Sequence, residues 1–250
     1  MRDPADVLPS NSSWLGRLLR LPLRAIPGDA VLPILAGPSR GLKWIAGSGP
    51  NSNWLGINEV NKRRRFVREV KVGHTVYDIG ANVGSYTLLA ARLVGPDGFV
   101  VAIEPLPANL RYLERHVRLN DLENVHVVPA AATDRVRTLR FQGTADRVTS
   151  HIAADGDIIV DGTTVDELAG RDGMRAPDVM KIDVEGAEVD VLRGATRTLA
   201  TKRPTVFLAT HGDAALAECH TFLQAAGYTI EAIPDLPHEF IATPRVSPVE

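Results

Sequence analysis

Short apolar runs alternate with amphipathic segments along the chain from about residue 72 onward. Runs of β-branched and aromatic residues predict buried strands, whereas leucines three or four positions apart predict helices. The predicted strands lie at residues 76–79, 99–104, 125–128, 178–183, 204–209, 228–233 and 239–242. The predicted helices lie at 106–120, 187–199 and 214–226, with another that carries Leu88, Leu89 and Leu93. This alternation predicts an α/β fold with a doubly wound, mostly parallel sheet, which binds ligands at the carboxyl ends of its strands.

Two further strand-like pieces, at residues 138–141 and 157–160, flank a loop that contains Arg147 and His151. The first 72 residues differ, because seven prolines interrupt them and glycine is frequent after residue 37. We therefore predict an irregular, partly helical N-terminal extension at residues 1–72. Residues 73–250 form the predicted main domain, with the extension covering the side where an acceptor substrate binds.

Two basic segments in this extension have competing interpretations. Residues 14–24 combine leucines with arginines and could lie on an anionic membrane surface, although so short a segment more often packs on its own domain. The run Lys62–Arg65 is typical of a nucleic-acid patch when taken alone. Phe66 and Val70 follow it at helical spacing, so we interpret the run as the solvated face of an amphipathic helix.

Composition narrows the classes of function. A formal net charge of −2 gives no electrostatic reason to expect a nucleic-acid partner. A single cysteine, Cys219, excludes an internal disulfide framework and a cysteine-based zinc site. Without a long apolar run or a recognisable secretion signal, we expect a cytoplasmic protein that acts on a small molecule or glycan; a homodimer stays open.

Residues 76–87 carry the most specific signal, since a strand leads through Gly80 and Gly84 into a helix. Such a turn lets a ligand approach bare backbone beside the N–H groups of the helix N-terminus. Asp78 would repel a pyrophosphate but would hold an ammonium group. The spacing also lacks the Gly-x-Gly step of a dinucleotide site. S-adenosylmethionine (SAM), a nucleoside joined to an amino acid, suits this turn better than NAD, with its ammonium on Asp78.

A second carboxylate, Glu104, ends the next predicted strand. In nucleotide-binding α/β folds an acidic residue at this place accepts hydrogen bonds from the ribose hydroxyls. The sequence therefore predicts that Glu104 binds the ribose of the cofactor.

A third group of polar residues follows the strand that ends near Asp183. Asp183 and Glu185 can orient an ammonium group, act as a general base or ligate a cation, and no metal site is assigned from the sequence. Glu188 is interpreted as a helix cap. His211 follows the next strand at the same sheet edge, where a neutral imidazole could act as a base.

These motifs together resemble the FkbM-type family of SAM-dependent methyltransferases, over about residues 30–245. The resemblance implies a seven-stranded class I methyltransferase fold with an antiparallel last strand, and O-methylation of sugars or natural products. The cofactor-binding residues that it implies are Asp78, Gly80, Ala81, Asn82, Gly84, Ser85, Thr87, Glu104, Asn109 and Ala131.

The resemblance extends upstream to Trp54-Leu-Gly-Ile-Asn-Glu59, which implies that Trp54 and Glu59 contact the acceptor. Asn58 stands where the family usually has an aromatic residue. A glutamate that many members carry shortly before the histidine is also missing, since Leu208, Ala209 and Thr210 occupy that stretch. Acceptor preference and any role of that glutamate therefore cannot be carried over.

The expected reaction is direct in-line displacement, because the sulfonium of SAM already activates the methyl group. Asp183 and His211 are the candidate bases, with Glu185 orienting the substrate. Three alternatives stay open: an RNA methyltransferase, a nicotinamide-dependent oxidoreductase on a similar sheet, and a non-catalytic SAM-binding scaffold.

Overall fold

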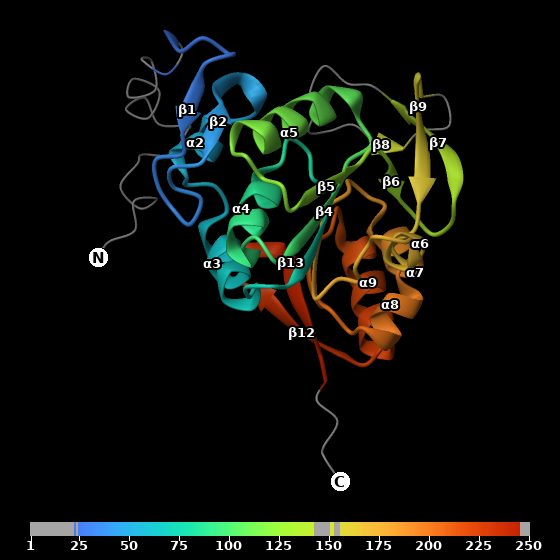
Figure 1. The fold of residues 1–250 in the computed structure, drawn as a ribbon. Coiled ribbons are helices and arrows are strands. Elements are labelled where there is room, and N and C mark those ends of the chain that lie inside the picture. Colours follow the sequence, from blue (N-terminus) through green and yellow to red (C-terminus); the bar gives the residue numbers. More distant parts are fainter. Residues whose placement is uncertain (1–22, 24, 143–150, 153–155, 246–250) are drawn as a thin grey trace.

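The computed structural model describes residues 23, 25–142, 151–152 and 156–245 (Figure 1). A seven-stranded sheet in the order β12-β13-β11-β10-β3-β4-β5 forms the centre of these residues. Its strands are β3 (Thr75–Ile79), β4 (Phe99–Ile103), β5 (Val125–Val128), β10 (Val179–Ile182), β11 (Thr205–Ala209), β12 (Tyr228–Ile233) and β13 (Leu236–Pro244).

The direction of the strands confirms the predicted class I methyltransferase fold. Strands β11, β10, β3, β4 and β5 pair in parallel, and the last strand, β13, runs antiparallel to both β11 and β12. The chain lays β3, β4 and β5 side by side and then returns to place β10 on the other side of β3. In open α/β sheets, ligands bind at such a switch point, outside the carboxyl ends of the strands.

Helices cover both faces of the sheet (Figure 1). Because successive side chains of a strand point to opposite faces, Val76 packs toward one layer and Tyr77 toward the other. Three helices cover the face of Val76: α3 (Val60–Glu69), α4 (Ser85–Val94) and α5 (Pro107–Leu119). Helices α3 and α4 pack in the same cluster as Val76, and α5 packs on β4 and β5. The helices of the opposite layer are α6 (Val165–Gly170), α7 (Glu188–Arg193), α8 (Thr196–Thr201) and α9 (Asp213–Ala225).

A smaller sheet in the order β6-β9-β7-β8 lies between β5 and β10 in the chain. Its strands are β6 (Ala131–Ala132), β7 (Arg137–Gln142), β8 (His151–Ile152) and β9 (Ile158–Thr163). Strands β7 and β9 confirm the two predicted strand-like pieces. Arg147 and the side chain of His151 lie outside the described part of the chain.

The predicted helix at residues 187–199 is wrong in one respect, because the structure divides it into α7 and α8. Gly194 lies between them, and a Cβ atom on it would come within 2.0 Å of the Thr133 carbonyl oxygen. The Gly194 carbonyl accepts a hydrogen bond from the Asp166 N–H. The backbone therefore bends where it packs against a loop that comes from a different part of the sequence.

The N-terminal extension is more regular than predicted. Strands β1 (Val31–Pro33) and β2 (Lys43–Ile45) form an antiparallel pair, followed by a short 3₁₀ turn, η3 (Ala46–Ser48), and by α2 (Asn51–Leu55) and α3. Trp44 is fully buried and stacks on His116 of α5, with ring centroids 4.1 Å apart. This contact packs the β1–β2 part of the extension against α5, one of the helices that cover the main sheet. The boundary near residue 72 stays a prediction, and residues 14–22 and 24 of the basic segment lie outside the described residues.

Helix α3 confirms the predicted helix over the basic run, but the interpretation of that run as a solvated face is wrong for two of its residues. Lys62 is fully buried and its ammonium lies 2.6 Å from Glu239. Arg63 is 7% exposed and donates one hydrogen bond to Ser85 and one to Ser39. Two of the four positive charges of this run therefore face inward, whereas Arg64 is exposed and Arg65 is half-buried beside Glu231.

None of the helices within the described ranges has both the length and the apolar character needed to cross a bilayer.

Candidate active site

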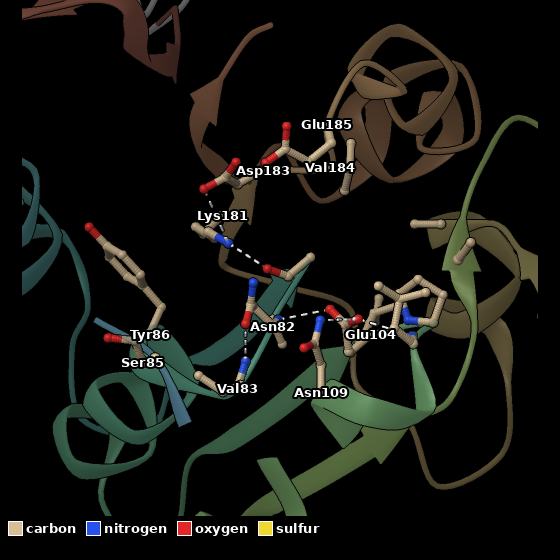
Figure 2. Close-up of a pocket in the computed structure, with 18 of the residues that line it drawn as sticks. Asn82, Val83, Ser85, Tyr86, Glu104, Asn109, Lys181, Asp183, Val184 and Glu185 are labelled. Carbon is tan, nitrogen blue, oxygen red and sulfur yellow. Dashed lines mark hydrogen bonds and ion pairs between the residues drawn. The ribbon is translucent and has the colours of Figure 1, made fainter. Parts of the chain in front are cut away.

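A pocket opens at the carboxyl ends of β3, β4 and β10, beside the switch point of the sheet (Figure 2). Its walls come from the turn after β3, the loop after β4, the turn after β10, the small sheet and the segment from η3 to α3. The lining residues used below are Asn53, Asn58, Glu59, Gly80, Ala81, Asn82, Ser85, Tyr86, Glu104, Asn109, Ala131, Lys181, Asp183 and Glu185.

The glycine-rich turn between β3 and α4 forms the floor of this pocket. Gly80 has a φ of +74°, and a Cβ atom built on it would lie 1.9 Å from the Asp183 carbonyl oxygen. Glycine is required there both by the backbone angle and by the neighbouring strand. Asn82 also has a positive φ, of +51°, which asparagine tolerates better than most residues. The turn thus exposes backbone to a ligand, as the sequence predicts.

Glu104 lies at the end of β4 with only 4% of its surface exposed (Figure 2). Its Oε2 accepts a hydrogen bond from the Asn82 N–H at 2.8 Å, and its Oε1 accepts from the Leu106 N–H and from Asn109, both at 3.0 Å. Burial raises the pKa of this carboxyl despite those hydrogen bonds. A carboxylate has about four acceptor positions, so Glu104 retains capacity for a ligand hydroxyl in the pocket.

Asp78 lies beneath the glycine-rich turn and is not among the pocket-lining residues, so its predicted contact with the ligand's ammonium group stays a prediction. Its side chain is buried, its Oδ2 accepts a hydrogen bond from Thr87 at 2.6 Å, and its Oδ1 lies 3.3 Å from the Lys181 ammonium. Gly84 and Thr87 are likewise behind the pocket wall. In this structure the cation beside Asp78 is the side chain of Lys181.

Lys181 is a pocket residue whose role the sequence analysis missed. Its ammonium donates a hydrogen bond to the Gly80 carbonyl at 2.8 Å and lies 3.8 Å from Asp183. Burial alone would lower the pKa of Lys181, but the charges of Asp78 and Asp183 outweigh it and raise the pKa. Lys181 therefore connects the glycine-rich turn to the turn after β10.

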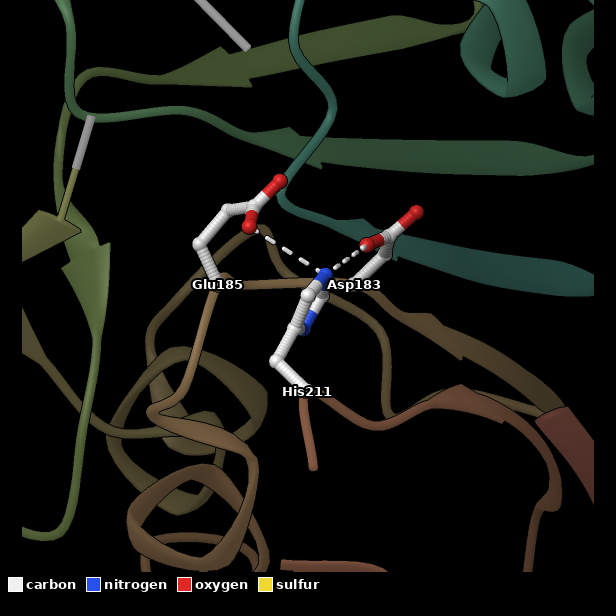
Figure 3. A group of neighbouring side chains, drawn as sticks. All are labelled: Asp183, Glu185 and His211. Atoms are coloured by element: carbon white, nitrogen blue, oxygen red, sulfur yellow. Dashed lines mark ion pairs between the residues drawn. The ribbon is translucent and has the colours of Figure 1, made fainter. Parts of the chain in front are cut away.

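Asp183, Glu185 and His211 form a cluster (Figure 3), of which Asp183 and Glu185 line the pocket and His211 lies beside them outside its lining. The Nε2 atom of His211 lies 3.2 Å from Glu185 and 3.9 Å from Asp183. All three side chains are about one-third exposed. Burial lowers the pKa of His211, but its hydrogen bond to Glu188 and the surrounding carboxylates raise it above its usual value. The predicted catalytic residues thus lie together, as their strand-end positions indicate.

Glu188 is a second residue whose role the sequence analysis missed. The interpretation as a helix cap is correct in part, because its Oε1 accepts a hydrogen bond from the Gly186 N–H at 2.9 Å. The same oxygen lies 2.6 Å from Nδ1 of His211, and the side chain is fully buried. Glu188 therefore also fixes the orientation of the His211 ring.

The two residues predicted to contact an acceptor differ in position. Glu59 lines the pocket from the start of α3, next to Asn58. Trp54 is instead 5% exposed and packs in a cluster with apolar residues such as Trp44 and Leu88. Its indole donates a hydrogen bond to Asn51 at 3.1 Å. The prediction that Trp54 forms an acceptor wall is therefore not supported by its position, because its apolar surface is used inside the protein.

Seven of the ten predicted cofactor residues line the pocket: Gly80, Ala81, Asn82, Ser85, Glu104, Asn109 and Ala131. The pocket also contains Asn53 and Tyr86, which are not among the predicted site residues, although Tyr86 lies within the segment 76–87. Tyr86 follows the glycine-rich turn immediately, so its position there could have been noticed.

A protein-family model described as "Methyltransferase FkbM domain" matches residues 78–230, which is more than half of the chain. The match includes the glycine-rich turn, Glu104, the cluster after β10 and His211.

Two characterised methyltransferases are similar to this chain in sequence. Hexuronic acid methyltransferase AglP of Haloferax volcanii is 25% identical over 140 residues, which are 54% of this chain and 56% of that protein. The 31-O-demethyl-FK506 methyltransferase FkbM of Streptomyces tacrolimicus is 27% identical over 201 residues, which are 67% of this chain and 77% of that protein. The chain thus matches little more than half the length of AglP.

Among solved structures, the methyltransferase FkbM from Methylobacillus flagellatus KT superposes with a TM-score of 0.52 at 16% identity. The superposition covers 78% of this chain and 55% of the other. Precorrin-6y C5,15-methyltransferase from Geobacter metallireducens GS-15 gives a TM-score of 0.50 at 18% identity, with 76% and 90% covered. At such low sequence identity, these superpositions show that the chain shares the fold of these methyltransferases.

Proposed function

Because the chain belongs to the FkbM methyltransferase domain family, we propose that it is a SAM-dependent methyltransferase acting on a hydroxyl of a sugar, glycan or natural product. The observation that carries this proposal is the position of Glu104. Its buried carboxylate ends β4, contacts the glycine-rich turn and borders the pocket at the switch point of the sheet. An acidic residue so placed binds the ribose hydroxyls of a nucleoside cofactor.

The remaining pocket residues suit SAM. Asn109 lines the pocket and its amide donates a hydrogen bond to Glu104, which holds that carboxylate in place. The glycine-rich turn lets the cofactor approach the backbone closely. Asp78 supports this arrangement from behind, by holding Lys181 against the Gly80 carbonyl.

Bound SAM would supply a methyl group on a positively charged sulfur, which is already activated for transfer. The protein then has to hold an acceptor hydroxyl in line with that methyl group and to receive its proton. Asp183 and His211 are the candidates to receive the proton, and Glu185 would orient the hydroxyl. Their partial exposure leaves the cluster accessible to a substrate.

The preference for a sugar, glycan or natural product rests on the relatives, which are named for a hexuronic acid and for 31-O-demethyl-FK506. The burial of Lys62 and Arg63 leaves fewer exposed cations in the basic run for phosphate contacts, which favours a small acceptor over RNA. We propose that Glu59 and Asn58 contact the acceptor from the α3 side of the pocket.

A transfer assay with SAM labelled in its methyl group tests the proposal. The acceptors offered are neutral sugars, hexuronic acids, hydroxylated macrolides and mixed RNA. We expect label in a hydroxyl compound, at an oxygen, and none in RNA. Label in RNA alone would instead favour an RNA methyltransferase, and SAM binding without transfer to any class would favour a non-catalytic scaffold.

A further inference from the structure

Three potential ligand atoms converge at the edge of the pocket: Asp183 Oδ1, Glu185 Oε2 and His211 Nε2 (Figure 3). They lie within 4.8 Å of one another, and two of the separations are 3.2 and 3.9 Å. In an octahedral site with metal–ligand bonds of about 2.1 Å, neighbouring ligand atoms are roughly 3 Å apart and opposite ones roughly 4.2 Å apart. The observed spacing is therefore compatible with one small cation after minor side-chain movement.

The orientation of the His211 ring follows from its other nitrogen. Nδ1 lies 2.6 Å from Glu188 Oε1, and an ionised carboxylate can only accept a hydrogen bond. Nδ1 therefore carries the hydrogen, and in a neutral ring Nε2 presents its lone pair to Asp183 and Glu185. In the protonated ring Nε2–H donates to Glu185, and in the neutral ring a cation between the three acceptor atoms would take the place of that proton. Metal-binding histidines commonly have this arrangement, with a carboxylate behind the ring.

Glu188 supplies a separate observation. Its side chain is fully buried against the His211 ring, and its Oε2 has no hydrogen-bond partner among the described residues. A buried carboxylate is costly unless a positive charge compensates it. Lys181, the pocket's buried cation, is held by Asp78, Asp183 and the Gly80 carbonyl. A positive charge at Nε2 of His211, on the side of the ring away from Glu188, would compensate the buried negative charge of Glu188.

We propose that Asp183, Glu185 and His211 bind a divalent cation of the Mg²⁺ or Mn²⁺ type, with Glu188 as a positioning residue behind the histidine. The two carboxylate oxygens suit such a cation, and the imidazole nitrogen favours Mn²⁺, a transition metal, over Mg²⁺. Three protein ligands leave positions in an octahedral shell for water or for a substrate.

The cation also has a consequence for the chemistry, which rests on the proposed methyltransferase function. An acceptor hydroxyl bound to the cation loses its proton more readily, because the positive charge stabilises the oxygen anion. With a cation bound, His211 and Asp183 would be ligands and would no longer receive the proton, which would leave to water instead. The same positions would hold a pair of neighbouring hydroxyls, as a sugar presents.

Electron paramagnetic resonance with Mn²⁺ tests the site without an acceptor, because bound Mn²⁺ loses the sharp signal of the free ion. We expect stoichiometric binding to the whole chain that excess Mg²⁺ reverses. His211→Ala and Asp183→Asn should weaken Mn²⁺ binding at least about tenfold, and Glu188→Gln by about ten- to a hundredfold. Asp213→Asn is the matched control, since its side chain is 98% exposed and lies two residues from His211.

Thermal melts and SAM titrations of the same variants show whether each is folded. Unchanged Mn²⁺ affinity in folded His211→Ala and Asp183→Asn would overturn the site, and so would an equal loss in Asp213→Asn. Wild-type protein that binds SAM but no Mn²⁺ would overturn the cation while leaving the methyltransferase proposal intact. Mn²⁺ binding without SAM binding would support the cation site and contradict the methyltransferase proposal.

Discussion

Lys181 and Asp78 are register partners on the two central parallel strands, β10 and β3, and their charged groups lie 3.3 Å apart. Both side chains are at least 95% buried. The pair lies where the chain changes direction across the sheet, directly beneath the glycine-rich turn. An apolar pair would fill this space equally well, but it could not hold the Gly80 carbonyl from below.

We expect Lys181→Met to destabilise the protein strongly, by about 3–5 kcal/mol, because it leaves the Asp78 carboxylate buried without its cation. The double variant Asp78→Asn/Lys181→Met should recover part of that loss, since the uncompensated charge is removed. Urea unfolding of the wild type and the variants measures both effects. A double variant no more stable than Lys181→Met would show that the buried charge is not the cause.

Gly80→Ala should be far more damaging than Gly73→Ala. Both glycines have a positive φ, of +74° and +82°, so alanine is strained by about 1–2 kcal/mol at either position. Only at Gly80 would the added Cβ meet backbone, the Asp183 carbonyl oxygen at 1.9 Å, whereas Gly73 faces open space. We expect Gly80→Ala alone to abolish SAM binding, as measured by calorimetry. Equal behaviour of the two variants would contradict the close approach of β3 and β10.

His116 should make stability depend on pH. Its Nδ1 lies 2.7 Å from the Val83 carbonyl and its Nε2 accepts a hydrogen bond from the Ile45 N–H, so the folded state needs the neutral ring. Burial lowers its pKa from 6.5 to about 4. This contribution to stability is complete above pH 6.5 and is lost as the pH falls toward 4. The full effect is about 3 kcal/mol.

His116→Leu removes the titrating group and serves as the comparison. Urea unfolding at pH 7.5 and at pH 4.5 should show a smaller loss of stability in the variant than in the wild type. The same loss in both proteins would exclude His116 as the source of the pH dependence.

The strands and the glycine-rich turn could be predicted from the sequence because their signals are local. The apolar, β-branched run 99–103 and the glycines of the turn Gly80–Gly84 can be recognised without knowing which segments pack against them. The position of Glu104 and Asp183 at the same edge of the sheet could also be predicted, because both follow strands that run parallel to each other.

The partners of buried polar groups could not be predicted, because they come from distant segments. From the sequence, Asp78 is interpreted as a carboxylate that binds a ligand, because its contact with Lys181 is visible only in the folded structure. Glu188 shows only a capping position in the sequence, and its contact with His211 depends on how β11 ends next to α7. Trp54 resembles an exposed recognition residue, yet the β1–β2 pair, which no local pattern indicated, covers the cluster in which it is buried.

Calorimetric titration of SAM into the wild type and Glu104→Ala tests the central claim, a SAM site at the ends of β3 and β4. Loss of a hydrogen bond to a charged group costs about 1.5–3 kcal/mol, so Glu104→Ala should bind SAM about ten- to a hundredfold more weakly. Glu114→Ala, an exposed glutamate on α5, should bind SAM as the wild type does. No SAM binding by the wild type, or unchanged affinity in folded Glu104→Ala, would contradict the account.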